Sequence, residues 1–163
     1  MAETDPMTGA GNRAAWSRAQ ITAETDPNVS IVAFDVNNLK AANDLVGHHF
    51  GDEMITNASN AAAGAAQEVG VANRLFRLGG DEFVAIVPND RVAQYIDAAE
   101  RLYGGHEAGG YTVSITGGVG NTLEEADHAL RAIKAGRNGG AYRNLGPQDA
   151  AQEAAQLTKQ QAV

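Results

Sequence analysis

The feature that most constrains this sequence is a pair of apolar segments on either side of two glycines. Residues 75–78 and 83–87 flank glycines 79–80, which permit the positive φ angles of a tight turn. This pattern predicts a β-hairpin, and because residues 83–87 are all apolar we expect it in the middle of a sheet that is covered on both faces. Its turn carries Asp81 and Glu82 at the rim of the core. Paired acids in such a place require a compensating cation or proton.

Composition indicates a single domain. The chain has 163 residues, 44% of them hydrophobic, which is enough for one core but not for two. We expect one domain over residues 1–147 and an Ala/Gln-rich tail or linker over residues 148–163.

Charge and residue usage exclude several classes of function. The net charge of −8 argues against non-specific binding to nucleic acid or to an anionic membrane. The sequence has no cysteine, so it cannot form disulfides or a zinc-thiolate site. No segment has the pattern of a membrane span or a signal peptide, and we therefore expect a cytoplasmic protein.

A second predicted strand brings another acid toward the hairpin. Residues 29–34 are apolar and partly β-branched, which predicts a buried strand that stops at Asp35. Two helices should follow, the first beginning at Asn38 and broken at Gly47. Because Asp35 ends a central strand and Asp81 lies on a neighbouring turn, the two acids should meet at one edge of the sheet. Carboxylates on rigid backbone are the ligands that Mg²⁺ uses in phosphoryl transfer.

The flanking segments complete an α/β (α+β) sandwich. Asn12 is a predicted N-cap, and Thr122 opens a capping box for a late helix. Residues 111–115 alternate like a strand, residues 104–110 have the glycines of a loop, and residues 116–118 have the pattern of a local insertion after that strand. Strands and helices in this order predict a central sheet with helices on both faces.

Five segments resemble the motifs of one family, the GGDEF domain of diguanylate cyclases. The hairpin turn spells its signature, Gly-Gly-Asp-Glu-Phe, at residues 79–83. The other matching segments are residues 5–9 with 12–13, residues 35–44 with 47–48 and 51–52, residues 112–115, and residues 136–138. The resemblance covers roughly residues 5–138 and implies the mostly antiparallel, ferredoxin-like palm of nucleotide cyclases.

The resemblance implies a reaction between two substrate molecules. Two GTP molecules would condense to cyclic di-GMP and two pyrophosphates, as the 3′-hydroxyl of one attacks the α-phosphate of the other. Each copy of an antiparallel homodimer would hold one GTP. A regulatory domain could be fused to this domain or associate with it. Since the opening motif begins at Asp5, we expect a stand-alone or excised domain that dimerises weakly and has low basal turnover.

The resemblance also implies a metal site. Asp35, the carbonyl of Val36, and Asp81 would hold Mg²⁺ (or Mn²⁺), and Glu82 would assist a second ion. Either Asp81 or Glu82 would accept the hydroxyl proton, and the sequence leaves both open.

Positive groups for the phosphates follow from the same resemblance. The backbone N–H groups of Asn38 and Leu39, at a helix N-terminus, would bind the β- and γ-phosphates together with Lys40. Lys134 and Arg137 would add positive charge from the late helix. This sequence departs from the family there, since it is one residue shorter between Lys134 and Gly136 and has Arg131 where tyrosine is usual.

Asn43 and Asp52 are the residues that the resemblance assigns to guanine. A carboxylate at Asp52 can accept hydrogen bonds from N1–H and the exocyclic amine of guanine, whereas adenine offers neither donor there. GTP would therefore be preferred over ATP.

Several alternatives stay open. Asp81 and Glu82 could form an ordinary solvated turn, and Asn43 and Asp52 could be ordinary helix-surface polarity. The chain could be a low-activity or inactive GTP-binding or scaffolding module, or a related cyclase that makes another cyclic (di)nucleotide. Asp52 disfavours the last of these.

Overall fold

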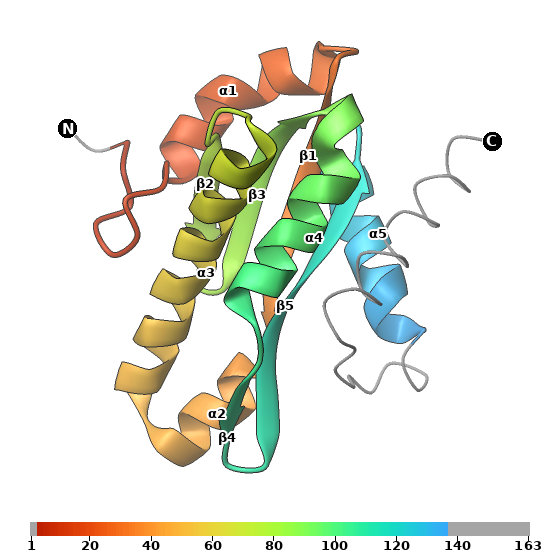
Figure 1. The fold of residues 1–163 in the computed structure, drawn as a ribbon. Coiled ribbons are helices and arrows are strands. Elements are labelled where there is room, and N and C mark those ends of the chain that lie inside the picture. The colour runs from red at the N-terminus through yellow and green to blue at the C-terminus, as the bar shows by residue number, and fades with distance from the viewer. Residues whose placement is uncertain (1–2, 137–163) are drawn as a thin grey trace.

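A computed structural model of the chain describes residues 3–136, in which one five-stranded antiparallel sheet carries helices on both faces (Figure 1). In chain order the elements are α1 (Arg13–Thr25), β1 (Val29–Asn37), α2 (Leu39–Val46), α3 (His48–Val69), β2 (Leu75–Gly79), β3 (Glu82–Pro88), a 3₁₀ turn (Asn89–Arg91), α4 (Val92–Tyr103), β4 (His106–Ala108), β5 (Tyr111–Gly120) and α5 (Leu123–Ala135). The strand order is β2-β3-β1-β5-β4. The predicted sandwich is confirmed.

The glycine hairpin forms as predicted, but its place in the sheet differs. β3 lies next to the central strand β1, whereas β2 is an edge strand, so the expectation that the whole hairpin lies in mid-sheet is wrong. The outer edge of β2 is covered by the N-terminal segment. The N–H of Gly11 donates to the carbonyl of Leu75 at 3.0 Å, and the N–H of Arg77 donates to the carbonyl of Gly11 at 2.7 Å. These bonds satisfy backbone groups that an edge strand otherwise exposes.

Strand β1 is longer than the sequence suggested. It continues past Asp35 to Asn37, and Asp35 lies within the sheet with Glu82 opposite on β3 and Thr116 opposite on β5. Asp35 therefore does not end the strand, although it does lie beside the hairpin turn. A polar residue is tolerated within the strand because this end of the sheet borders a cavity.

Strand β5 is also longer, and residues 116–118 are part of it rather than an insertion. Its pairing with β1 is continuous from Ile31 opposite Gly120 to Asn37 opposite Ser114. The glycines allow α5 to pack closely, because a Cβ at Gly118 would lie 2.5 Å from the backbone of α5. The short strand β4 occupies part of the segment expected to be a loop.

Two clusters of buried residues hold the helices against the sheet. Val32 and Phe34 of β1 belong to the larger cluster, with the buried faces of α3 and α4. Ile31 and Ala33 belong to the smaller cluster on the opposite face, with Trp16 of α1 and residues of α5. This alternation explains why β1 is apolar almost throughout, since both of its faces are covered.

The predicted helix boundaries at Asn12, Gly47 and Thr122 are confirmed. The side chains of Asn12 and Thr122 accept hydrogen bonds from the backbone N–H three residues on, at 3.0 and 3.1 Å, as N-caps do. Gly47 separates α2 from α3, and Gly70 ends α3 with a φ of 76°.

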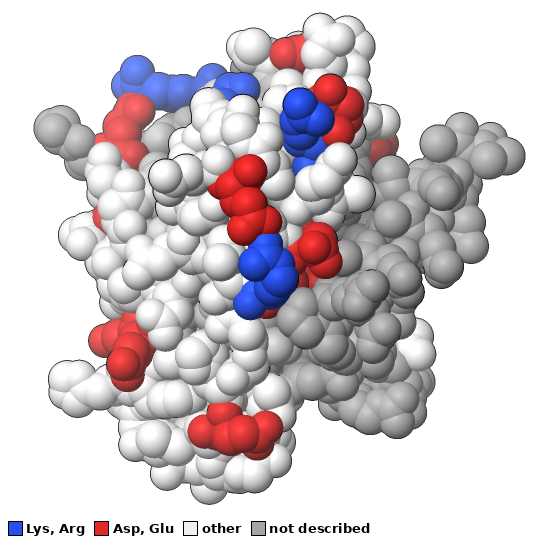
Figure 2. All heavy atoms as spheres, in the orientation of Figure 1, with Lys and Arg blue, Asp and Glu red and all other residues white. Residues whose placement is uncertain are grey.

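Figure 2 shows one face of the molecule, on which lysine and arginine side chains are interspersed with acidic ones and form no continuous basic area among the described residues. Between residues 3 and 136, no helix combines the length and the hydrophobicity needed to cross a membrane. The predicted tail at residues 148–163 and the predicted phosphate ligand Arg137 lie outside the described residues.

Candidate functional site

One cavity gathers most of the residues that the sequence singled out. It has a volume of about 460 Å³ and lies where the end of β1 meets the start of α2. Of the predicted site residues, it is lined by Asp35, Val36, Asn38, Leu39, Lys40, Asp81 and Lys134. Segments far apart in the chain therefore contribute their predicted metal and phosphate ligands to a single space.

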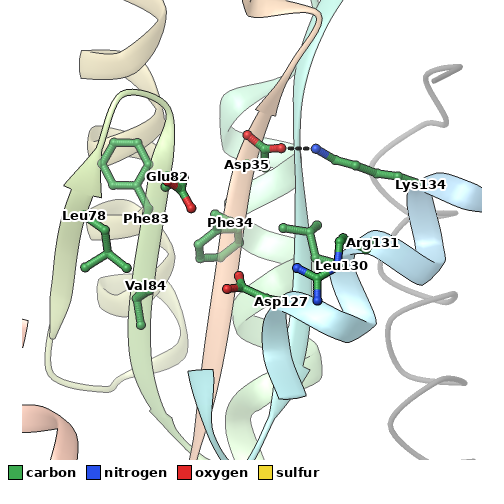
Figure 3. Close-up of a pocket in the computed structure, with 10 residues that line it drawn as sticks. All are labelled: Phe34, Asp35, Leu78, Glu82, Phe83, Val84, Asp127, Leu130, Arg131 and Lys134. Carbon is green, nitrogen blue, oxygen red and sulfur yellow. Dashed lines mark hydrogen bonds and ion pairs between the residues drawn. The ribbon is translucent and has the colours of Figure 1, made fainter. Parts of the chain in front are cut away.

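A smaller cavity of about 150 Å³ adjoins the first, between α5 and the strands β1 and β3 (Figure 3). Asp35 and Lys134 line both cavities, and Glu82 lines the smaller one. Figure 3 shows Lys134 extending from α5 to Asp35, with which it forms an ion pair. The predicted carboxylates thus lie along one continuous edge.

The sheet register explains how Asp35 and Glu82 come together. They are directly opposite each other on neighbouring antiparallel strands, so their side chains project from the same face of the sheet. Like charges in this arrangement repel each other, and the ion pair from Lys134 offsets the charge of Asp35. The side chains of Lys134 and Asp35 are 26% and 23% exposed.

Asp81 lies in the turn itself and is partly buried. Burial raises the pKa of Asp81, and a hydrogen bond to its backbone and the charge of Arg77 only partly offset this effect. Its neighbour Glu82 is exposed. The two adjacent carboxylates therefore have different surroundings, and only Asp81 lines the larger cavity.

Arg77 fixes the turn that carries Asp81. Its guanidinium donates to the carbonyl of Gly80 through Nε at 3.0 Å and Nη2 at 2.9 Å, and Nη1 lies 3.2 Å from both carboxylate oxygens of Asp5. Asp5 also accepts hydrogen bonds from the N–H and the hydroxyl of Thr8, at 3.0 and 2.7 Å. Burial alone would raise the pKa of Asp5, but these hydrogen bonds and the charge of Arg77 lower it overall.

The start of α2 has the features predicted for phosphate binding. Asn38 has a φ of 62°, a left-handed conformation that asparagine tolerates, and its side chain donates to the carbonyl of Thr112 at 3.0 Å. This bond holds the first turn of α2 against β5. Asn38 and Leu39 therefore line the cavity at a helix N-terminus, where backbone N–H groups are available to an anion.

Asn37 contributes a buried polar group beside the same cavity. It is 2% exposed, and its Nδ2 donates to the hydroxyls of Ser114 at 3.1 Å and Thr116 at 2.7 Å. Within the described part of the chain, its Oδ1 has no hydrogen-bond partner. This end of the sheet is thus polar on the side where Asp35 lies.

The predicted guanine ligands lie elsewhere. Asn43 and Asp52 are at the junction of α2 and α3, and neither lines the two cavities described above. The carboxamide of Asn43 is engaged locally, since its Oδ1 accepts from the N–H of Gly51 and its Nδ2 lies 3.2 Å from Nδ1 of His48. Gly51 leaves the room that this arrangement needs, because a Cβ there would lie 2.7 Å from Asn43 Oδ1.

Sequence reasoning missed several charged residues around these cavities. Asp44 lines the larger cavity one turn after Lys40, and Asp127 and Arg131 line the smaller one. Their i, i+4 spacing was a usable signal, since Lys40 and Asp44 lie on one face of α2 and Asp127 and Arg131 on one face of α5. The role of Arg77 had no signal in sequence, because its partner Asp5 is 72 residues away.

The oxygen atoms that line the larger cavity are of the kind that bind a divalent metal. Between residues 3 and 136, no three acidic or histidine side chains lie close enough together to hold an ion by themselves. The donors are nevertheless hard carboxylate and carbonyl oxygens, and the ammonium of Lys134 already places a cation on Asp35. Oxygens of a bound phosphate would complete such a donor set.

Comparison with known sequences identifies a family whose model covers all of the described residues. A family model for "Diguanylate cyclase, GGDEF domain" matches residues 2–139. The chain is 33% identical to the response regulator PleD of Caulobacter vibrioides. The alignment is 165 residues long and covers 85% of this chain and 35% of PleD. The chain is 33% identical to the diguanylate cyclase DgcS of Shewanella oneidensis over 88 residues, covering 51% of this chain and 29% of DgcS. The chain thus spans about a third of the length of these two relatives.

Comparison with solved structures gives the same fold. The GGDEF domain of DgcB from Caulobacter crescentus, solved in complex with c-di-GMP, superposes with a TM-score of 0.69 at 23% sequence identity and covers 87% of this chain and 95% of that one. Diguanylate cyclase SiaD from Pseudomonas aeruginosa, solved with its activator SiaC, superposes with a TM-score of 0.69 at 21% identity and covers 85% of this chain and 60% of that one. Together with the match to the family model, the fold and the signature turn show that this chain belongs to the GGDEF domain family of diguanylate cyclases.

Proposed function

We propose that this domain condenses two GTP molecules to cyclic di-GMP and two pyrophosphates, with one nucleotide held by each copy of a homodimer. The observation that carries the proposal is the larger cavity, because the acidic residues proposed to bind metal and the lysines proposed to bind phosphate line the same space. Family membership and the described relatives support the same reaction.

Each residue has a proposed task. Asp35, the carbonyl of Val36, and Asp81 would hold Mg²⁺ or Mn²⁺, and Glu82 would assist a second ion. When bound, the metal would stabilise the charge that develops on the phosphate oxygens during transfer.

The triphosphate would lie along the start of α2. The N–H groups of Asn38 and Leu39 would donate to its β- and γ-phosphates, and Lys40 and Lys134 would balance their charge. Arg137 is proposed to add a further cation, on the strength of the family resemblance alone.

Asp81 or Glu82 would take the proton from the attacking 3′-hydroxyl. Burial raises the pKa of Asp81, so its carboxylate is more basic than that of a fully exposed aspartate. Glu82 is exposed and opposite Asp35, where it could act on a hydroxyl that approaches from the second nucleotide.

We propose that the reaction takes place in the cytoplasm.

Asn43 and Asp52 would select guanine. The hydrogen bonds of the Asn43 carboxamide to Gly51 and His48 use one of its two N–H donors and one of its two oxygen lone pairs, so a second donor and a second lone pair remain for a base. Asp52 is exposed in the first turns of α3 and is open to a ligand.

A GTP-binding module with little turnover is the second candidate. The ion pair between Lys134 and Asp35 favours it, because this cation occupies a carboxylate that the proposed metal would need.

Product analysis separates these functions. The purified chain is incubated with GTP, ATP and Mg²⁺ together, and the products are identified by mass spectrometry. Cyclic di-GMP that disappears in D35N is the expected result. Bound GTP without any product would favour the second candidate, and a product containing adenine would indicate a different cyclase.

A further inference from the structure

The ion pair between Lys134 and Asp35 places an ammonium group where the proposed function needs a metal. Lys134 lies in the last turn of α5 and reaches Asp35 within β1 (Figure 3). Both residues line both cavities, so the ion pair borders the two. In the free chain, the Asp35 carboxylate is already occupied by a cation.

The other cations near the site are placed differently. Arg131 lines the smaller cavity but not the larger one, and its charge partly offsets the rise in the pKa of Asp127 that burial causes. Lys40 is exposed on α2 and lines the larger cavity, but it has no ion pair with any carboxylate between residues 3 and 136. Lys134 is therefore the cation that neutralises Asp35 in the part of the chain that the structure describes.

A divalent ion and an ammonium cannot share one carboxylate without strong repulsion, because their positive charges would lie only a few ångströms apart. A triphosphate changes this balance, since its negative charges attract the ammonium toward the phosphates and at the same time supply further oxygens for the metal. The flexible four-carbon side chain of lysine allows such a change of partner.

From this geometry we propose that Lys134 blocks the metal-binding carboxylate until a nucleoside triphosphate enters, so that metal and nucleotide bind together. The inference rests on the proposed function and adds an order of events to it. The free chain would bind a divalent metal weakly. Lys134 would thus weaken metal binding when nucleotide is absent and strengthen nucleotide binding when it is present.

The test measures metal binding without nucleotide. Free Mn²⁺ is titrated against the wild-type chain, K134M and K40M, with bound and free metal distinguished by electron paramagnetic resonance. K40M is a matched control, because it removes the same charge from the same cavity without releasing Asp35. We expect K134M to bind Mn²⁺ about tenfold more tightly than wild type, and K40M to stay within about twofold. The gain should vanish in D35N/K134M, and K134Q should reproduce it if K134M is poorly folded.

The possible results separate this proposal from the proposed function. A second titration adds a non-hydrolysable GTP analogue to wild type and D35N. If the analogue binds with Mn²⁺ in a manner that depends on Asp35, but K134M and K134Q show no gain in nucleotide-free metal affinity, the role of Lys134 is wrong and the proposed function stands. If neither metal nor analogue binding depends on Asp35, the proposed function fails and the blocking role fails with it.

Discussion

At the scale of single residues, the site depends on carboxylates that are costly to the fold. Asp35 and Glu82 are opposite each other across two strands, and Asp81 is partly buried in the adjacent turn. The sheet does not need these charges for its own stability, since the neighbouring positions on β1 and β3 are apolar and buried. Charged residues that lower the stability of the surrounding fold are typical of functional sites.

Asp81 should illustrate this conflict in its pH dependence. Because burial raises its folded-state pKa above the usual value of 3.8, the ionised carboxylate destabilises the fold at neutral pH, and this penalty disappears as the pH falls through the folded-state pKa. D81N should therefore be more stable than wild type at pH 7 although it loses cyclase activity, and the difference should shrink toward pH 4. Urea unfolding at both pH values measures this, with E53Q on the exposed face of α3 as the control. A D81N chain that is less stable than wild type at pH 7 would contradict the claim that the ionised Asp81 carboxylate destabilises the fold.

Asp52 should determine the choice of base. D52S removes the acceptor for both guanine donors, so the ratio of kcat/KM for GTP over ATP should fall by at least about tenfold. Steady-state kinetics with both nucleotides measures the ratio. E53S is the matched control, because it removes the same charge from the next exposed position of α3 and should leave the ratio unchanged. Unaltered discrimination in D52S would refute the role in guanine recognition.

At the scale of elements, the packing of α5 on β5 positions Lys134. A Cβ at Gly118 would lie 2.5 Å from the carbonyl oxygen of Ala126 and from the backbone nitrogen of Leu130, so no side chain fits there without moving the helix. A Cβ at Gly117, on the opposite face, would meet only side chains, the nearest being the ring of Phe34 at 3.0 Å.

Gly118→Ala should therefore push α5 away from the sheet. We expect a loss of roughly 1–3 kcal/mol in the free energy of unfolding and weaker binding of a GTP analogue, because Lys134 moves with the helix. G117A should lose less stability and leave analogue binding nearly unchanged. Denaturant unfolding and calorimetry give the two values. The packing argument would be wrong if G118A matched wild type in both.

The same contacts show which elements were predictable from sequence. The hairpin, the helix caps at Asn12 and Thr122, and the acids near the turn follow from local patterns, and these features were found. The full length of β5 was not, because its glycines have the pattern of a strand break, whereas in the fold they make room for α5. The ion pair of Lys134 with Asp35 joins residues 99 apart, and no local pattern encodes it.

At the scale of the whole molecule, one chain provides half of the proposed reaction. In the proposed reaction, the larger cavity would hold one triphosphate beside one set of carboxylates, and the attacking hydroxyl would come from a nucleotide on a second copy. Two-fold association of identical surfaces is the usual way for a protein to bring two such sites face to face.

Activity should therefore depend on enzyme concentration. Well below the dissociation constant of the dimer, doubling the enzyme should roughly double the specific activity, since the dimer fraction rises in proportion. Initial rates over a dilution series measure this. Two copies joined by a flexible linker are the control, because the linker raises their effective concentration and should remove the dependence. Constant specific activity in the unlinked chain at every dilution would contradict a dimeric reaction.

The most direct test of the central claim is a crystal structure with Mn²⁺ and a non-hydrolysable GTP analogue, in which anomalous scattering locates the metal. The proposed site predicts a peak within about 2.5 Å of a carboxylate oxygen of Asp35, with Asp81 and the analogue's phosphates as further ligands, and with Lys134 moved from Asp35 to the phosphates. A metal bound elsewhere while Asp35 still pairs with Lys134 would contradict it.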